Sequence, residues 1–274
     1  MSEWNLVYQY WQSMWAHHLH TIYSLQQQRQ KRLKQVDLFA KQRQESRKNG
    51  QQQIGYQLHT KLLIEDKGTY YHEEIVQDRT AYLENGHVIA EQPNPINKGT
   101  GQREIEVTSD FTRFYYDRRA AVQYAERWWN GANPAYPFFE EDDCTNYISQ
   151  CLRAGGIPMT GMPNRSKGWW YQDYQWSYSW SVAHSFRWYL SGAVAGWNGG
   201  EVSQASDLWP GDVICYDFQG DGRWDHNTIV VAKDSNNQPL VNAHTNNSRN
   251  RYWTYEDSAA WTPACEYRFF RISD

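Results

Sequence analysis

The sequence predicts an α+β protein in two parts, a small helix-plus-antiparallel-meander domain followed by a larger mixed domain. Near the start, apolar residues recur every three or four positions, which is the spacing of an amphipathic helix. Alternating runs then follow, separated by Lys-Gly and Asn-Gly pairs that indicate hairpins. Further on, a cysteine-initiated helical run precedes strand-turn-strand patterns. This order of elements is typical of a mixed α+β fold.

The first 95 residues form the predicted accessory domain. Trp4, Val7 and Trp11 begin a helical stripe that we expect to continue to about Lys48, because the second half of this stretch is rich in Gln, Lys and Arg, which are good helix formers. Residues 53–92 then read as strands, with turns at Lys67-Gly68 and Asn85-Gly86. We therefore expect helices followed by an antiparallel meander.

Residues 96–107 are a predicted linker, because the stretch around them is dense in Pro, Gly and Asn. A short strand is expected at 105–107, and the second domain is assigned to residues 108–274. It should open with a helix in YYDRRAAVQYAERWW, which the Asn130-Gly131 pair ends.

Composition limits the kind of protein. A net charge of −4 argues against a general nucleic-acid binder, although residues 1–50 hold eight basic and three acidic residues. The four cysteines form no CxxC pair, which argues against a zinc site, and no cofactor is expected. No apolar run is long enough for a membrane span, and no signal peptide is visible. We expect a cytoplasmic protein, unless an export segment is absent from this chain.

Cys144 is the strongest candidate for a catalytic residue. It lies in EDDCTNYISQCLRAGG, where an acidic loop meets a helix predicted from Cys144 to Ala154 and stopped by Gly155-Gly156. A thiol at a helix N-terminus is exposed to the positive end of the helix dipole, which favours the nucleophilic thiolate. Asp142 and Asp143 are expected to cap this helix, with Asp143 turned towards backbone N–H groups. The alternative is a cysteine that packs in the core.

His226 is the candidate general base. The run WPGDVICYDFQGDGRWDHNTIVVAKD predicts a strand over Asp212–Phe218, a Gly-Asp-Gly turn, and a strand from His226 to Ala232. The following strand offers Asn242 and His244, which are two positions apart and share a face. Either could orient the imidazole. The alternative is a hydrogen-bonded turn histidine. Asp217, Asp221 and Asp225 lack calcium-loop spacing, so a hairpin turn is favoured there.

These motifs, in this order, resemble the putative amidase domain family, which belongs with NlpC/P60-like cysteine hydrolases of papain type. The resemblance rests on DDCTNYISQCLRAGG, WPGDVICYDFQGDGRWDH and VNAHTNN, and it covers about residues 110–255. It implies a papain-like fold in which Cys144 is the nucleophile and His226 the base, with Asn242 or His244 as the third residue. It also implies hydrolysis of an amide, commonly in a peptide of the bacterial cell wall, without a metal.

Substrate contacts are predicted near the nucleophile. The chain holds 15 Trp and 20 Tyr, more large aromatic side chains than a core requires. Trp169 and Trp170 lie between the nucleophile and the base in sequence, so we expect them, with Asp143, to contact a peptide or glycopeptide. Core packing is the alternative for both tryptophans.

Three other functions fit the same sequence. A non-catalytic peptide- or glycan-binding module could retain the same residues by descent, and an acyl or peptidyl transferase would use an amine in place of water. A structural protein built around the basic, Gln-rich N-terminal region is the third alternative.

Overall fold

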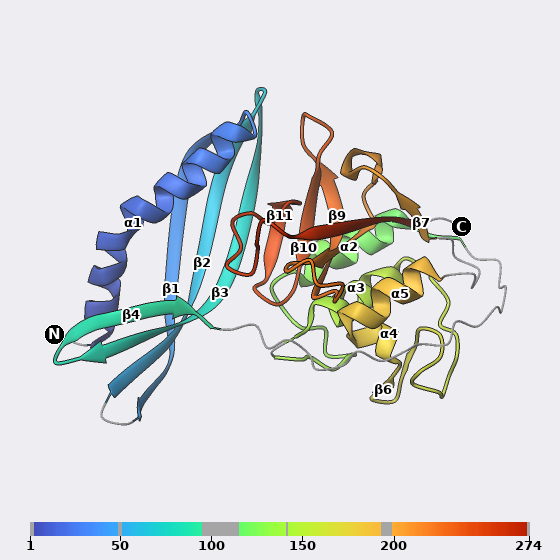
Figure 1. The fold of residues 1–274 in the computed structure, drawn as a ribbon, viewed down its shortest axis with the longest axis horizontal. Helices are drawn as coiled ribbons and strands as arrows, with labels where there is room; N and C mark the ends of the chain where they lie inside the picture. The colour runs from blue at the N-terminus through green and yellow to red at the C-terminus, as the bar shows by residue number, and fades with distance from the viewer. Residues whose placement is uncertain (1–2, 49–50, 95–114, 141, 193–198, 273–274) are drawn as a thin grey trace. The chain divides into compact units, whose positions relative to one another are not determined.

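The computed structural model describes residues 3–48, 51–94, 115–140, 142–192 and 199–272. The chain divides into two compact units, one formed by residues 1–95 with 257–259, the other by 96–256 with 260–274. The predicted linker at 96–107, with the expected strand at 105–107, lies outside the described residues. Each unit has its own core, so each is described separately (Figure 1).

The first unit is one long helix against a meander. Helix α1 spans Glu3–Gln28 and is followed by strands that pair in the order β1-β2-β3, with β4 on β3. The strands are β1 (Arg32–Lys48), β2 (Gln51–Asp66), β3 (Thr69–Glu84) and β4 (His87–Pro93). A small core of Val7 from α1 against Ile54, Tyr56 and Leu83 joins helix to sheet.

The two predicted hairpin turns are confirmed. Lys67 and Gly68 connect β2 to β3 with φ of 45° and 86°, and Asn85 and Gly86 connect β3 to β4 with φ of 49° and 76°. Positive φ at both central residues matches the right-handed twist of the flanking strands, which is why Gly and Asn occur there.

The predicted continuation of the first helix to about Lys48 is wrong. Helix α1 ends at Gln28, Gln30 adopts a left-handed φ of 59°, and residues 32–48 form β1. Fifteen residues of β1 have a partner in β2, from Arg32 opposite Glu65 to Lys48 opposite Gln51. The Gln, Lys and Arg residues have a weak intrinsic helix preference, and pairing along a whole strand overrides it.

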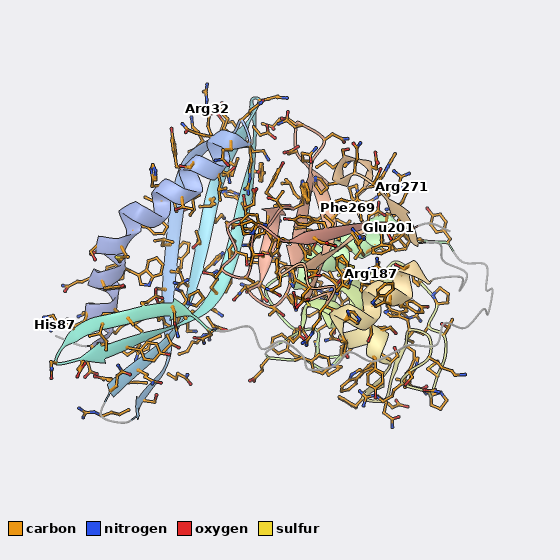
Figure 2. The ribbon with its side chains drawn as sticks, in the orientation of Figure 1. Arg32, His87, Arg187, Glu201, Phe269 and Arg271 are labelled. Carbon is orange, nitrogen blue, oxygen red and sulfur yellow. The ribbon has the colours of Figure 1, made fainter. Side chains whose placement is uncertain are left out.

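The second unit is an antiparallel sheet with helices on one face. Its strands are ordered β11-β10-β9-β8-β12-β7. Their bounds are β7 (Gly199–Val202), β8 (Val213–Asp217), β9 (His226–Lys233), β10 (Pro239–Ala243), β11 (Ser248–Tyr252) and β12 (Glu266–Ile272). Figure 2 marks the β12–β7 end with Glu201, Phe269 and Arg271.

The helices of this unit pack on one face of its sheet. They are α2 (Arg118–Trp128), α3 (Cys144–Ala154), α4 (Tyr178–Ser181) and α5 (Ala183–Ser191), with a 3-10 turn η1 (Ala205–Asp207) and a small hairpin of β5 (Tyr171–Gln172) and β6 (Gln175–Trp176). The observed α3 has the predicted bounds. Helix α2 begins after Asp117, whose carboxylate accepts from the Ala120 N–H.

Two cores lie on opposite faces of this sheet. Ile148 and Leu152 of α3 pack with Cys215 and Ile229 on the helical face. Tyr216, Val230 and Val241 pack with Tyr255 and Leu208 on the other face. Strands β8, β9 and β10 are therefore buried on both faces over most of their length. Among the described residues, no helix is long and apolar enough to cross a membrane.

Candidate active site

Cys144 is the first residue of α3 and lies against the central strand β9. The side chain is 1% exposed. Helix α3 packs on β9, and the hydroxyl of Thr145 accepts from the side-chain amide of Asn227 at 2.8 Å. The helix ends at Gly155 because a left-handed Gly156, with φ of 95°, turns the chain back. The thiol is therefore held at a helix N-terminus, as the sequence predicts.

Three groups contact the sulfur. Asp142 Oδ1 is 3.5 Å from Cys144 Sγ and Thr145 Oγ1 is 3.6 Å away, while the backbone N–H of Asn227 donates to the sulfur. Burial raises the pKa of the Cys144 thiol well above its usual value, and the Asp142 carboxylate raises it further. The hydroxyl and the amide act in the opposite direction. In this state Cys144 is a protonated thiol.

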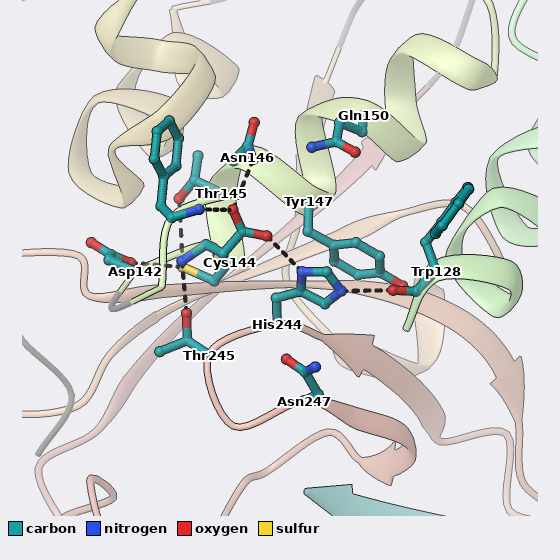
Figure 3. A network of polar contacts seen from close by, with 12 residues as sticks. Trp128, Asp142, Cys144, Thr145, Asn146, Tyr147, Gln150, His244, Thr245 and Asn247 are labelled. Atoms are coloured by element: carbon teal, nitrogen blue, oxygen red, sulfur yellow. Dashed lines mark hydrogen bonds and ion pairs between the residues drawn. The ribbon is translucent and has the colours of Figure 1, made fainter. Parts of the chain in front are cut away.

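Asp143 is bound to His244 and is turned away from the sulfur. Its Oδ2 lies 2.6 Å from His244 Nδ1, and its Oδ1 accepts from the Phe139 N–H at 3.0 Å and from Asn146 Nδ2 at 2.8 Å (Figure 3). Asp143 is the N-cap residue of α3 and its carbonyl oxygen accepts from the Tyr147 N–H, but its side chain makes no capping bond to the helix. Its carboxylate is turned towards a backbone N–H as predicted, although that N–H belongs to Phe139, outside the helix. With 3% exposure it lies inside the site, where a substrate has no direct access to it.

His244 binds acceptors at both ring nitrogens. Besides Asp143 at Nδ1, the carbonyl oxygen of Trp128 lies 2.7 Å from Nε2, and the ring stacks on Tyr147 with centroids 4.0 Å apart (Figure 3). A carbonyl oxygen only accepts, so Nε2 donates to Trp128, while Nδ1 is paired with the Asp143 carboxylate. His244 thus holds Asp143, and through it the start of α3, in place.

The structure does not bring His226 to Cys144. His226 is opposite Tyr216 on β8 and shares its face of the sheet, so its ring packs against Phe218 and Tyr255. Its Nε2 lies 3.3 Å from the Tyr255 hydroxyl. Helix α3 covers the other face, where Asn227 points. The predicted pair is therefore separated by the sheet at this position, and the described residues show no hydrogen bond between them.

His226 is neutral in this setting. Burial, and to a smaller extent the charge of Arg251, lower the pKa of its imidazole from 6.5 to about 3. The ring is thus in the protonation state that a general base requires, although it faces away from the thiol.

Asn242 is the second candidate for the third residue, and it too has structural partners. Its Nδ2 donates to Glu126 Oε1 at 2.9 Å, and its Oδ1 accepts from the Asn250 N–H at 2.9 Å. The side chain links α2 to strand β11. Neither Asn242 nor His244 contacts His226 among the described residues.

Trp169 and Trp170 lie in the core. Their exposures are 0% and 1%, and their indole N–H groups donate to Ser149 Oγ at 2.9 Å and to the Asn164 carbonyl at 3.1 Å. Trp169 also packs on Trp180, with ring centroids 4.8 Å apart. The structure therefore places both indoles as core packing residues, in contrast to the predicted role in lining a groove, because such large flat rings fill the space beneath α3.

The Asp217 loop is a hairpin turn held by its own carboxylates. Asp217 is fully buried and accepts from the N–H groups of Gly220 and Gly222 at 2.9 and 2.7 Å. Within the described residues, no group of three or more His, Cys, Asp and Glu side chains is placed to hold a metal ion.

Sequence reasoning missed Thr145 and Asn227, which contact the sulfur directly. Each is next in sequence to a residue that was selected, Cys144 and His226. Asn227 and Ile229 are two positions apart on β9, so their side chains lie on the same face of the sheet. This alternation along the strand was the signal in the sequence that could have identified Asn227. The alternation identifies Asn227 as a neighbour of the sulfur only if the face of β9 that α3 covers is already known.

An antiparallel sheet covered on one face by helices, with a cysteine at a helix start on its central strand, defines a mixed α+β protein with a thiol site. Residues 115–269 match the putative amidase domain family. The chain belongs to this family.

Two relatives come from Bacillus subtilis (strain 168). The chain is 50% identical over 232 residues to "Uncharacterized protein YhbB", covering 81% of this chain and 74% of that protein. It is 30% identical over 147 residues to "Uncharacterized protein YjcM", covering 49% of this chain and 32% of that protein. No solved structure matches.

Proposed function

We propose that this protein hydrolyses amide bonds with the Cys144 thiol as nucleophile, on a papain-like domain of the NlpC/P60 type. The observation that carries the proposal is the sulfur at the first residue of α3, packed on β9 with the Asn227 N–H donating to it. A helix N-terminus and a backbone donor both favour a thiolate. Membership of the putative amidase domain family supports the amide as the bond that is cut.

His226 is the proposed base, and it requires a local rearrangement. Its neutral imidazole can accept the thiol proton, but it faces Tyr255. Asn227, the next residue, already touches the sulfur, so the rearrangement has to turn the backbone at the first residue of β9 and bring the ring to the face that α3 covers. His244 and Asn242 hold the helix start and the neighbouring strand while this happens.

The reaction has two steps. The sulfur attacks the carbonyl carbon while its proton passes to the imidazole, and the backbone N–H of Cys144 stabilises the oxyanion. The C–N bond then breaks, the imidazolium gives its proton to the leaving amine, and a thioester remains. Water hydrolyses the thioester and restores the thiol. We propose a peptide or glycopeptide of the bacterial cell wall as the substrate, as the family resemblance implies.

The test compares the parent protein with Cys144→Ala on purified peptidoglycan and a panel of peptide amides. We expect the parent to release new amines and Cys144→Ala to lose at least about a thousandfold in rate. Cys265→Ala, at a half-buried cysteine outside the site, is the matched control and should keep the parental rate. Equal activity of parent and Cys144→Ala would exclude the proposal. His226→Gln and His244→Gln then identify the base, since only its loss should match that of Cys144→Ala.

A non-catalytic binding module is the second candidate, because the thiol is buried and protonated in this state. In that case Cys144→Ala would bind peptidoglycan as well as the parent, and neither would release amines. A burst of amine release in the parent would contradict this alternative.

A further inference from the structure

Asn227 touches the start of α3 through two different groups. It is the second residue of β9, has no exposed surface, and lies opposite Cys215 on the face that α3 covers. Its backbone N–H donates to Cys144 Sγ, and its side-chain Nδ2 donates to Thr145 Oγ1 at 2.8 Å. One strand residue thus contacts the candidate nucleophile and its neighbour together.

The Thr145 hydroxyl has a defined direction for its proton. It is fully buried, and its two partners are Asn227 Nδ2 at 2.8 Å and Cys144 Sγ at 3.6 Å. A hydroxyl has one proton to donate, and an amide nitrogen cannot accept. Because the hydroxyl oxygen accepts from Asn227, its own proton is available to the sulfur. The three groups form a relay of donors that ends at Cys144.

The orientation of the Asn227 amide decides whether this relay exists. With Nδ2 towards Thr145, the amide oxygen Oδ1 is buried and has no hydrogen-bond partner among the described residues. The reverse orientation would place that oxygen against the hydroxyl and draw its proton away from the sulfur. A buried acceptor without a partner is uncommon in proteins, and here it occurs beside the candidate nucleophile.

We propose that Asn227 is a positioning residue that directs the Thr145 hydroxyl proton to Cys144 and so favours the thiolate. The inference rests on Cys144 being the nucleophile of the proposed function. Among the charged and titratable groups near the sulfur, Asp142 at 3.5 Å opposes the thiolate. Asp143 is engaged with His244, and the His226 ring lies on the far face of β9.

The test measures the pH dependence of iodoacetamide modification at Cys144, followed by peptide mass spectrometry. It uses the full chain with Cys265→Ser, because Cys265 is the cysteine that is not fully buried. In this background we expect Asn227→Ala and Thr145→Val each to raise the midpoint of the rate profile by about one pH unit. The double variant should match either single one, because both substitutions break the same relay. Thr145→Ser retains the hydroxyl and should keep the parental midpoint.

Protection of Cys151 and Cys215 from the reagent shows that each variant is folded, since both are buried. If Asn227→Ala fails this check, Asn227→Leu, whose side chain has the same number and branching of heavy atoms as Asn, replaces it. Unchanged midpoints, or an Asn227→Ala shift that persists in the Thr145→Val background, would overturn the relay. If the relay is overturned in this way but hydrolysis still depends on Cys144, the proposed function is retained. Full hydrolysis by Cys144→Ala would remove the proposed function and leave the titration result untouched.

Discussion

Neighbouring carboxylates at the start of α3 have opposite relations to the thiol. Asp142 lies 3.5 Å from Cys144 Sγ and disfavours the thiolate, whereas Asp143 is bound to His244 and fixes the chain that leads into the helix. Both residues follow the same acidic loop. The difference arises because successive side chains leave an irregular backbone in different directions. The stability of the Cys144 thiolate therefore depends on which of the two carboxylates lies next to the sulfur.

The buried, neutral His226 makes the stability of the second unit depend on pH. Its folded-state pKa is about 3, while an unfolded histidine titrates near 6.5. Below pH 6.5 the unfolded chain takes up a proton that the folded protein does not bind until about pH 3. Stability therefore falls as pH falls through this window, by about 1.4 kcal/mol per pH unit, and is unaffected above it.

We expect the parent to lose about 3 kcal/mol more than His226→Gln between pH 6.5 and pH 4. Urea unfolding followed by reaction of Cys151 and Cys215 with a disulfide reagent that is active in acid reports on this unit alone, because all four cysteines belong to it. His87→Gln, at an exposed position on β4, is the matched control. If the free energy of unfolding changed by the same amount with pH in the parent and in His226→Gln, the result would contradict the burial of a neutral His226.

The face on which His226 lies was not predictable from the sequence. Strand β9 is buried on both faces, so its residues do not alternate between apolar and polar, and nothing in the run HNTIVV marks the side that α3 covers. His226 and Asn227 are adjacent on the strand, so their side chains point to opposite faces of the sheet. The face that α3 covers therefore decides which of the two residues contacts the sulfur. Cys144 was predictable because helix boundaries leave local signals.

The site depends on helix α3, and Gly155 at the end of this helix determines how closely it packs against Tyr116 and Ala121. A Cβ built on Gly155 would lie 2.3 Å from Tyr116 Cε2 and 3.2 Å from Ala121 Cβ. The Tyr116 hydroxyl in turn donates to the Gly211 carbonyl at 2.7 Å. The first glycine of the Gly-Gly pair thus leaves room for an aromatic ring, and the second provides the left-handed turn.

Gly155→Ala should destabilise the second unit by about 1–3 kcal/mol, because the Tyr116 ring and α2 must move to admit the methyl group. The thiol-exposure assay in urea at neutral pH measures this loss. Gly131→Ala is the matched control, since no atom lies within 4 Å of its added Cβ. Equal unfolding midpoints for the two variants would show that α3 and α2 are less tightly packed than described.

Helices, strands and turns were predicted correctly from the sequence where interactions between residues close together in the chain determine them. Helix α3 and the turns at Lys67-Gly68 and Asn85-Gly86 follow from the Gly155-Gly156 stop and from left-handed backbone conformations. Strand β1 was predicted as a helix because its Gln, Lys and Arg residues carry a local preference, whereas its structure comes from fifteen pairings with β2. Such pairings depend on a partner elsewhere in the chain, and local patterns do not contain them.

On the scale of the whole molecule, the cores separate by unit. The cluster around Val7 and Ile54 contains residues of the first unit alone, and the two clusters around the central sheet contain residues of the second alone. The match to the putative amidase domain family, residues 115–269, also falls within the second unit, except for residues 257–259. The thiol site therefore draws its residues from one compact body.

We expect residues 96–274, expressed alone, to fold and to keep the thiol site. The physical reason is that the partners of Cys144, namely Asp142, Thr145 and Asn227, belong to this unit, as do the cores on both faces of its sheet. In native buffer, Cys151 and Cys215 of the fragment should resist alkylation as in the full chain, Cys144 should be modified with the same pH profile in both, and Cys265 should react in both. Mass spectrometry of the modified peptides makes the comparison. Rapid labelling of Cys151 and Cys215 in the fragment alone would show that the second unit needs the first in order to fold.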